Sequence, residues 1–103
     1  MPVYVSLVKF TRDGIMTMKD QGVSRSEAIK RNAEELGGKL VNAYYCLGEY
    51  DVVAIWEFPN NKAAMKAAVK SAALGHIQIS TMPALPRTEW TELLGEVFGK
   101  KKK

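Results

Sequence analysis

The side chain best suited to proton transfer in this chain is His76, which is the only histidine. A lone histidine can serve as a general base or as a haem ligand, whereas zinc usually requires three or four protein ligands. We therefore expect neither a metal site nor a cofactor. The alternative interpretation is a hydrogen-bonded histidine at the edge of an interface, and the sequence leaves both interpretations open.

Two carboxylates, Glu49 and Asp51, flank Tyr50 in a short segment between two apolar runs. A carboxylate close to a buried histidine can form an acid–base pair, so Asp51 is a candidate partner of His76. An aspartate in a tight turn also binds nearby backbone groups, and this gives the segment a purely structural role. The sequence favours the turn without excluding the pair.

Two other residues could carry chemistry but have weak sequence support. Cys46 is the only cysteine, which excludes an intramolecular disulfide, and a buried inert thiol is favoured over a nucleophile. Pro2 would become the N-terminal residue if Met1 were removed, as in tautomerases. That chemistry usually needs a nearby arginine, and Arg12 lies beyond the first predicted strand.

Length and composition indicate one globular domain, which we assign to residues 1–99. The chain has 103 residues, of which 47% are hydrophobic and 25% charged. The net charge of +4 equals the charge of the terminal run Lys100–Lys103, which we expect to be a disordered tail. Nucleic acid is therefore not the expected partner, and only the row Lys62, Lys66 and Lys70 adds to the tail as an alternative basic surface.

The remaining exclusions concern the membrane and nucleotide ligands. The N-terminus lacks the basic and apolar regions of a signal peptide, and no apolar stretch approaches 18 residues. We expect a cytoplasmic protein. No P-loop, Gly-x-Gly-x-x-Gly or Cys-x-x-Cys motif occurs, so nucleotide, dinucleotide and iron–sulfur functions lack their usual support.

The hydrophobic periodicity predicts an α+β fold with the element order β-α-β-β-α-β-α. Strands are predicted over 3–10, 39–47, 52–56 and 76–84, a short helical turn around Ile15, and helices over 24–36, 59–74 and 90–98. Ser24 and Glu27 have the spacing of a capping box at the start of the second helical segment. Met65, Ala68, Val69 and Ala72 are the predicted apolar stripe of the helix over 59–74. The first six long elements have the order of a ferredoxin-like plait with a four-stranded antiparallel sheet.

In such a plait the helices cover one face of the sheet, and alternation along the strands predicts which side chains lie there. We expect the covered set to be Val3, Val5, Leu7, Val41, Ala43, Tyr45, Val53, Ile55, Ile77 and Ile79. The opposite set is then Tyr4, Ser6, Val8, Phe10, Asn42, Tyr44, Cys46, Ala54, Trp56, Phe58, His76, Gln78, Ser80 and Met82. An aromatic, uncharged face is uncommon on a monomer, so a second subunit, the C-terminal helix or both should cover it.

A gap over that second face would have aromatic walls and scattered hydrogen-bonding groups, which is typical of a small-molecule site. The predicted ligand-binding residues are Tyr4, Ser6, Tyr44, Trp56, His76 and Gln78. The expected ligand is small and apolar or partly aromatic. The same aromatic side chains could instead fill an interface between subunits.

The segment Leu47–Val53 resembles the signature of the GYD domain family, with Gly48, Glu49, Tyr50 and Asp51 as the motif. Tyr4–Thr11 and Glu35–Lys39 are similar to that family as well. The resemblance implies a ferredoxin-like domain related to the dimeric α/β-barrel proteins. These include cofactor-independent monooxygenases, isomerases and proteins of no known activity.

Together, the residues and the resemblance predict a homo-oligomeric module that binds a small molecule or has a structural role. It would use the open face of its sheet and pair through that face as a dimeric α/β barrel. The alternative is a cofactor-independent monooxygenase or isomerase. In that case His76 would be the catalytic residue, acting with Tyr44, Ser6 or Asp51.

Overall fold

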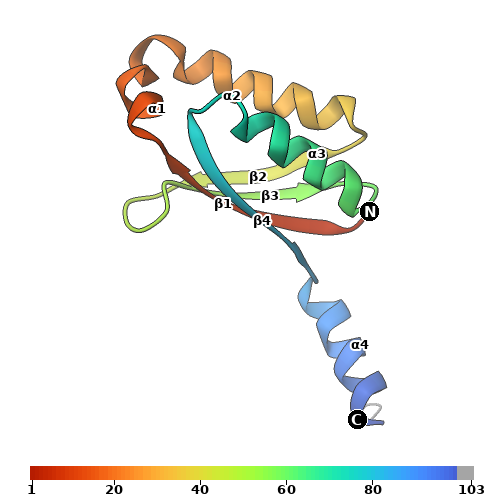
Figure 1. Ribbon diagram of the computed structural model, residues 1–103. Helices are drawn as coiled ribbons and strands as arrows, with labels where there is room; N and C mark the ends of the chain where they lie inside the picture. The colour runs from red at the N-terminus through yellow and green to blue at the C-terminus, as the bar shows by residue number, and fades with distance from the viewer. Residues whose placement is uncertain (100–103) are drawn as a thin grey trace.

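The computed structural model describes residues 1–99 and contains one antiparallel sheet with four helices (Figure 1). The elements follow the order β1 (Val3–Phe10), α1 (Arg12–Met16), α2 (Met18–Glu35), β2 (Lys39–Tyr45), β3 (Val52–Glu57), α3 (Asn61–Ala72), β4 (Ile77–Ala84) and α4 (Arg87–Phe98). The strand order is β2-β3-β1-β4, with every neighbouring pair antiparallel. The predicted ferredoxin-like plait with an added C-terminal helix is therefore confirmed. The predicted lysine tail, 100–103, lies outside the described residues.

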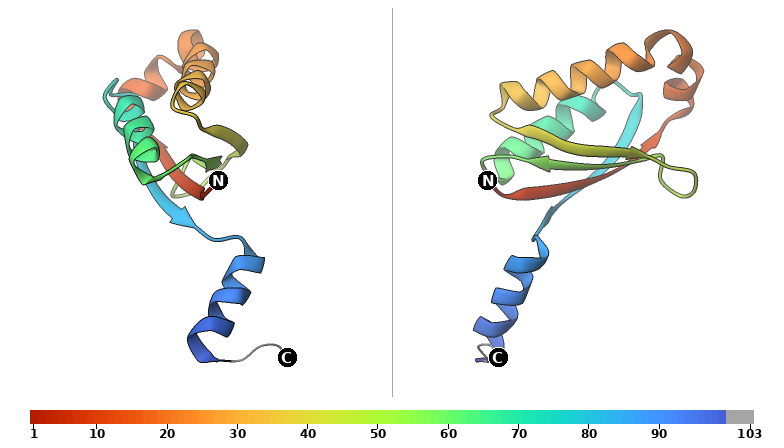
Figure 2. Two further views of the ribbon diagram at one scale, coloured as in Figure 1. Left: turned by 90° about the vertical axis from the view of Figure 1, so that its right-hand side faces the viewer. Right: turned by 180° about the vertical axis from the view of Figure 1, so that it is seen from behind.

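Both long helices, α2 and α3, lie on one side of the sheet, whereas α4 leads away from it (Figure 2). The Cα radius of gyration is 16.0 Å, compared with about 13 Å for a compact domain of 100 residues. No residue of α4 is buried. Hence α4 does not cover either face of its own sheet.

The core lies between the sheet and α3, and it pairs large aromatic side chains with small helical ones. Tyr4 and Phe58 pack edge to face with their ring centroids 5.8 Å apart, and Trp56 lies 5.9 Å from Phe58. The buried residues of α3 are Ala63, Ala64, Ala67 and Ser71. Because alanine side chains are short, the helix approaches the sheet while leaving room for the aromatic rings.

This packing corrects the predicted faces of the two central strands. The following residues, predicted to be open, are instead buried against the helices: Tyr4, Ser6, Val8, Ala54, Trp56 and Phe58. Val3, Val5, Leu7, Val53 and Ile55, predicted to be covered, lie on the other face. In β1 and β3 both sets are largely apolar, so alternation separates the sets without indicating which one meets the helices.

The edge strands agree better with the prediction, because they alternate between apolar and polar residues. Ala43, Ile77 and Ile79 line the helix side, whereas Gln78 and Ser80 share the other face with β1 residues. Val41 departs from the prediction. It lies at an irregularity between Leu40 and Asn42 and is 49% exposed.

We call the uncovered surface the open face. Its members are Val3, Val5, Leu7 and Lys9 of β1, Asn42 and Tyr44 of β2, Val53, Ile55 and Glu57 of β3, and Gln78, Ser80 and Met82 of β4. Aliphatic side chains of the two central strands form its middle. An uncovered face with an apolar middle therefore exists. Different residues of the two central strands build it, and Lys9 and Glu57 add charges that the prediction did not include.

Two predicted helix features are wrong in detail. Helix α2 begins at Met18, so Ser24 lies inside it and its hydroxyl donates to the carbonyl of Gln21 at 3.1 Å instead of capping the helix. In α3 the predicted apolar stripe is displaced, because Met65 and Val69 are 66% and 67% exposed. The start of α3 matches the expectation, since Asn60 accepts a hydrogen bond from the amide of Ala63 at 2.9 Å.

Candidate functional site

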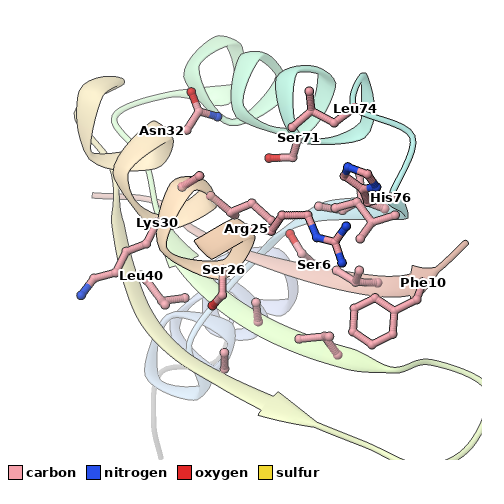
Figure 3. A pocket seen from close by; sticks show the side chains of 18 of the residues that line it. Ser6, Phe10, Arg25, Ser26, Lys30, Asn32, Leu40, Ser71, Leu74 and His76 are labelled. Atoms are coloured by element: carbon pink, nitrogen blue, oxygen red, sulfur yellow. The ribbon is translucent and has the colours of Figure 1, made fainter. Parts of the chain in front are cut away.

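A cavity of about 240 Å³ lies between α2, α3 and the helix-facing side of the sheet (Figure 3). Most of its lining is aliphatic or aromatic, and the polar or charged side chains that line it are those of Ser6, Arg25, Ser26, Lys30, Asn32, Lys70, Ser71 and His76. At about 30 Å³ per water molecule, the volume equals that of about eight waters or one single-ring organic molecule. The cavity is on the face of the sheet opposite to the one predicted for the ligand site.

One end of the cavity is fixed by contacts between α1 and the turn that precedes β4. The amide of Thr11 donates to the carbonyl of His76 at 3.0 Å, and the Thr11 hydroxyl donates to the carbonyl of Gly75 at 2.7 Å. Gly14 is buried, and a Cβ added there would lie 2.1 Å from the His76 carbonyl oxygen. The close backbone approach at Gly14 thus determines where His76 sits.

The imidazole of His76 is held beside a carboxylate of α1. Its Nδ1 lies 3.1 Å from Oδ2 of Asp13, and the two side chains are 23% and 67% exposed. The distance satisfies an ion pair, whereas Nδ1 makes no hydrogen bond of acceptable angle and is buried. The contact between Nδ1 and Oδ2 is therefore electrostatic and is not a hydrogen bond.

Arg25 of α2 places a guanidinium inside the cavity. Nη1 donates to the hydroxyl of Thr17 at 2.6 Å, and Nη2 donates to the carbonyl of Gly14 at 3.0 Å. Figure 3 shows the side chain extended into the cavity, toward the end where His76 and Phe10 lie. Within residues 1–99, no carboxylate lies within 4.0 Å of this guanidinium.

The structure divides the predicted ligand-binding residues between the two faces. Ser6, Trp56 and His76 line the cavity. Tyr4 is buried beside it, with its hydroxyl donating to Oδ1 of Asn61 at 2.5 Å.

The other two predicted ligand-binding residues belong to the open face. Tyr44 is 57% exposed there, and Gln78 pairs with Lys9 of β1 on the same side. The predicted grouping of Tyr44 with His76 is therefore wrong. The hydroxyl of Ser6 lies on the cavity side but is paired with that of Thr81 at 2.8 Å.

The motif residues Gly48, Glu49, Tyr50 and Asp51 form the loop between β2 and β3. Oδ2 of Asp51 accepts a hydrogen bond from the amide of Phe10 at 2.8 Å, and its own amide donates to the carbonyl of Val8 at 2.8 Å. The Asp51 carbonyl accepts from the amide of Cys46 at 2.8 Å. Asp51 thereby joins the loop to β1, which agrees with the turn interpretation. Its carboxylate binds a backbone amide of β1 and so has a structural role.

Lys9, Cys46 and Gly48 also belong to the surroundings of this loop. Nζ of Lys9 lies 5.7 Å from the ring centroid of Tyr50, within the range of a cation–π contact. Cys46 is exposed, so the expectation of a buried thiol is wrong. Gly48 has a φ of 138°, a conformation that side-chain-bearing residues rarely adopt.

Sequence reasoning missed Arg25, Ser71 and Asp13 as parts of this region. The spacing of Arg25 and Ser71 along their helices could have identified both residues. Arg25 lies four and eight residues before the apolar positions 29 and 33, and Ser71 follows the buried positions 63 and 67 at the same spacing. A polar residue at a core-facing helical position is a candidate cavity group. Asp13 carried no comparable signal, because its meeting with His76 depends on the tertiary fold.

The part of the chain that the structure describes holds no group of three His, Cys, Asp or Glu side chains that could bind a metal ion. None of its helices is both long enough and apolar enough to cross a membrane.

The family model described as "GYD domain" matches residues 4–94 of this chain. A curated relative from Thermus thermophilus, named glutamine synthetase and cystathionine beta-lyase binding protein, is 31% identical over 90 residues. The match covers 84% of this chain and 90% of the relative.

Solved structures with the same arrangement confirm the fold. A crystal structure of a protein from Thermus thermophilus has a TM-score of 0.53 and 17% identity, covering 84% of this chain and 95% of the other. An uncharacterized protein from Thermotoga maritima has a TM-score of 0.53 and 10% identity, covering 82% and 96%. At such identities the likeness extends to the fold alone.

Proposed function

We propose that this chain, which belongs to the GYD domain family, is a homo-oligomeric module that binds a small molecule. The observation that carries the proposal is the cavity of about 240 Å³, in which apolar walls surround the polar groups of Arg25 and His76. Few polar groups within an apolar enclosure are typical of ligand pockets, because apolar area supplies affinity and the polar groups fix orientation.

The proposed ligand site is on the helix side of the sheet, which leaves the open face for association. Half-buried Val5, Val53 and Ile55 occupy the middle of the open face, and no element within residues 1–99 packs over it. A second sheet packed against this face at about 10 Å would remove these side chains from water.

The exposed apolar side chains of helix α4 are a second observation that supports self-association. It has 12 residues and no buried residue, whereas isolated helices shorter than about 12–15 residues are marginal in water. Its apolar side chains Trp90, Val97 and Phe98 are 51%, 63% and 69% exposed. A surface on a second copy would stabilise α4 by burying them.

Association and ligand binding can be tested separately. Sedimentation of the wild-type protein at micromolar concentration should give about twice the chain mass of 11.4 kDa or more. Val5→Asp should shift the protein toward a single chain, because it adds a charge to the middle of the open face. Met65→Asp, at an exposed site of α3, is the matched control and should not. A wild-type species of one chain mass would reject self-association.

Ligand binding is tested with indole, a neutral probe that the cavity volume accommodates. Amide chemical shifts of cavity residues such as Ala54 and Ile79 should move on titration, while those of open-face residues such as Val53 stay unchanged. No response at the cavity, or an equal response on the open face, would reject the cavity as the binding site.

A second candidate function is the binding of other proteins. The Thermus thermophilus relative is named for binding glutamine synthetase and cystathionine beta-lyase, and α4 presents an apolar surface away from the domain (Figure 2). Under this alternative, Trp90→Ala combined with Phe98→Ala should abolish binding to the purified enzymes of the source organism but leave the oligomer intact. Loss of the oligomer in that variant would assign α4 to self-association instead.

A further inference from the structure

We infer that the cavity takes a small monocarboxylate with an apolar body, whose carboxylate is bound by Arg25 at the end of the cavity near His76. The inference rests on the proposed function, because it requires that the cavity bind a small molecule. It adds the chemical class of the ligand, which neither the fold nor the family provides.

The first support is the balance of charge around the cavity. Its lining includes Arg25, Lys30, Lys70 and His76 and, among the described residues, no aspartate or glutamate. Lys30 and Lys70 are exposed, and Lys30 points away from the cavity in Figure 3, whereas the guanidinium of Arg25 extends into it. A half-enclosed space with positive groups and no acidic ones attracts an anion.

The second support is the bonding of Arg25 itself. A guanidinium has five N–H donors, and the two hydrogen bonds to Thr17 and Gly14 hold it in place without neutralising its charge. Both acceptors are uncharged oxygens. A ligand carboxylate would supply a charge-assisted bond to a group that is already oriented, so little rotamer entropy would be lost on binding.

The third support is the position of His76. Its Nδ1 faces Asp13 at 3.1 Å, so Nε2 is the ring nitrogen left for a ligand. Asp13 is 67% exposed and does not line the cavity, and it therefore orients the ring without opposing an anion inside. His76 is in this view a positioning and hydrogen-bonding residue of the ligand site.

The same features disfavour two related ligand classes. An amino acid would bring an ammonium group that finds no carboxylate in the lining, and an unpaired buried charge is costly. A phosphate ester would bring a second negative charge, and the two further cationic residues of the lining, Lys30 and Lys70, are exposed to water and offer it no buried partner. A single carboxylate attached to a ring or branched chain matches both the charge and the walls.

The first experiment compares three probes on the wild-type protein: 3-phenylpropionate, its neutral analogue 3-phenylpropionamide, and phenylalanine. The acid should bind at least about tenfold more tightly than the other two, which corresponds to about 1.4 kcal/mol. Equal binding of acid and amide would overturn the carboxylate assignment while leaving a small-molecule site. No cavity response to any probe, indole included, would overturn the proposed function as well.

The second experiment uses Arg25→Gln, with Arg31→Gln as the matched control on the exposed surface of the same helix. Arg25→Gln should weaken phenylpropionate by about tenfold or more and leave phenylpropionamide unchanged, because only the charge-assisted bond is lost. Arg31→Gln should alter neither. An equal loss for both probes, or for both variants, would contradict the assignment.

Arg25 also supports α1, so a third variant separates binding from folding. Arg25→Lys keeps the positive charge and removes the planar pair of donors. With melting temperatures measured in parallel, it should retain part of the preference for the acid over the amide. Complete loss of that preference in a variant that melts like wild type would show that charge at position 25 does not select the ligand.

Discussion

Adjacent residues of one strand experience different environments on the two faces of this sheet. Trp56 is 8% exposed and packs beside Phe58, whereas its neighbour Ile55 is only half-buried on the open face. On the helix side, the buried hydroxyl of Ser6 is paired with that of Thr81. One face therefore completes its packing within the described residues, while the other is left uncovered by them.

Helices α3 and α4 have the same length but differ in burial, as the two faces of the sheet do. Each has 12 residues and an amphipathic pattern, yet α3 buries four residues and α4 none. Helix α3 is also capped by the Asn60 side chain, whereas Pro86 at the start of α4 provides no side-chain cap. An amphipathic sequence therefore indicates that a helix needs a partner surface, without indicating that the surface belongs to the same chain.

The largest expected effect comes from truncating one aromatic residue on each face of the sheet and comparing the losses of stability. Trp56→Ala should lower the free energy of unfolding by about 3–5 kcal/mol, because it removes a buried ring and leaves a cavity. Tyr44→Ala, on the open face at 57% exposure, should cost at most about 1 kcal/mol. Urea unfolding at one protein concentration measures both, and equal costs would contradict the contrast between the faces.

The second prediction concerns the loop that joins β2 and β3. Asp51→Ala should cost about 1.5–3 kcal/mol, the usual value of a hydrogen bond to a charged group, because the amide of Phe10 loses its acceptor. Glu49→Ala, at an exposed position of the same motif, should change stability by no more than about 0.5 kcal/mol. If thermal unfolding ranks the two variants the other way, the structural role of Asp51 is refuted.

The third prediction sharpens the description of the cavity end. Gly14→Ala should cost about 1–3 kcal/mol, because the new Cβ would collide with the backbone of His76. Phenylpropionate binding should fall with it, since His76 and Arg25 both depend on α1.

Gly22→Ala is the matched control for the melting temperature of Gly14→Ala, but not for binding, because Gly22 lines the cavity. Its Cβ would meet only the flexible side chain of Met18, and an alanine inside a helix gains up to about 1 kcal/mol over glycine. Wild-type melting and binding in Gly14→Ala would contradict the close approach.

The smallest expected effect belongs to the lysine run. Deleting Lys100–Lys103 should leave the Tm unchanged within error, because the run contains no apolar residue and its ammonium groups are most stable in water. A lower Tm in calorimetry would show that the run contributes to the folded state.

Much of the architecture was predictable because it depends on local signals. The order of strands and helices follows from hydrophobic periodicity, and the helix predicted over 59–74 begins close to the observed start of α3 at Asn61. The start of α2 was not predictable in this way, because Ser24 and Glu27 have the spacing of a capping box inside a longer helix. A local motif cannot show that the helix already began one turn or more upstream.

The candidate site was predictable in part, through single residues and not through their grouping. His76, Ser6 and Trp56 were identified by type and do line the cavity, whereas Tyr44 and Gln78 lie on the other face. The structure divides the predicted ligand-binding residues between two faces because the faces of β1 and β3 were exchanged in the prediction. Strand alternation divides the residues of a strand into two sets. When both sets are apolar, it does not show which set faces the helices.

By itself, then, the sequence determined the element order, the sheet faces of most edge-strand residues and the membership of the GYD domain family. Each of these depends on residues close together in the chain or on a polar–apolar alternation that has only one stable solution. Only the tertiary structure decided which side of the central strands meets the alanines of α3, that α4 leads away, and that Arg25 and His76 share one cavity. These features depend on packing between distant segments, where the fit of side-chain volumes, and not the local pattern, selects the arrangement.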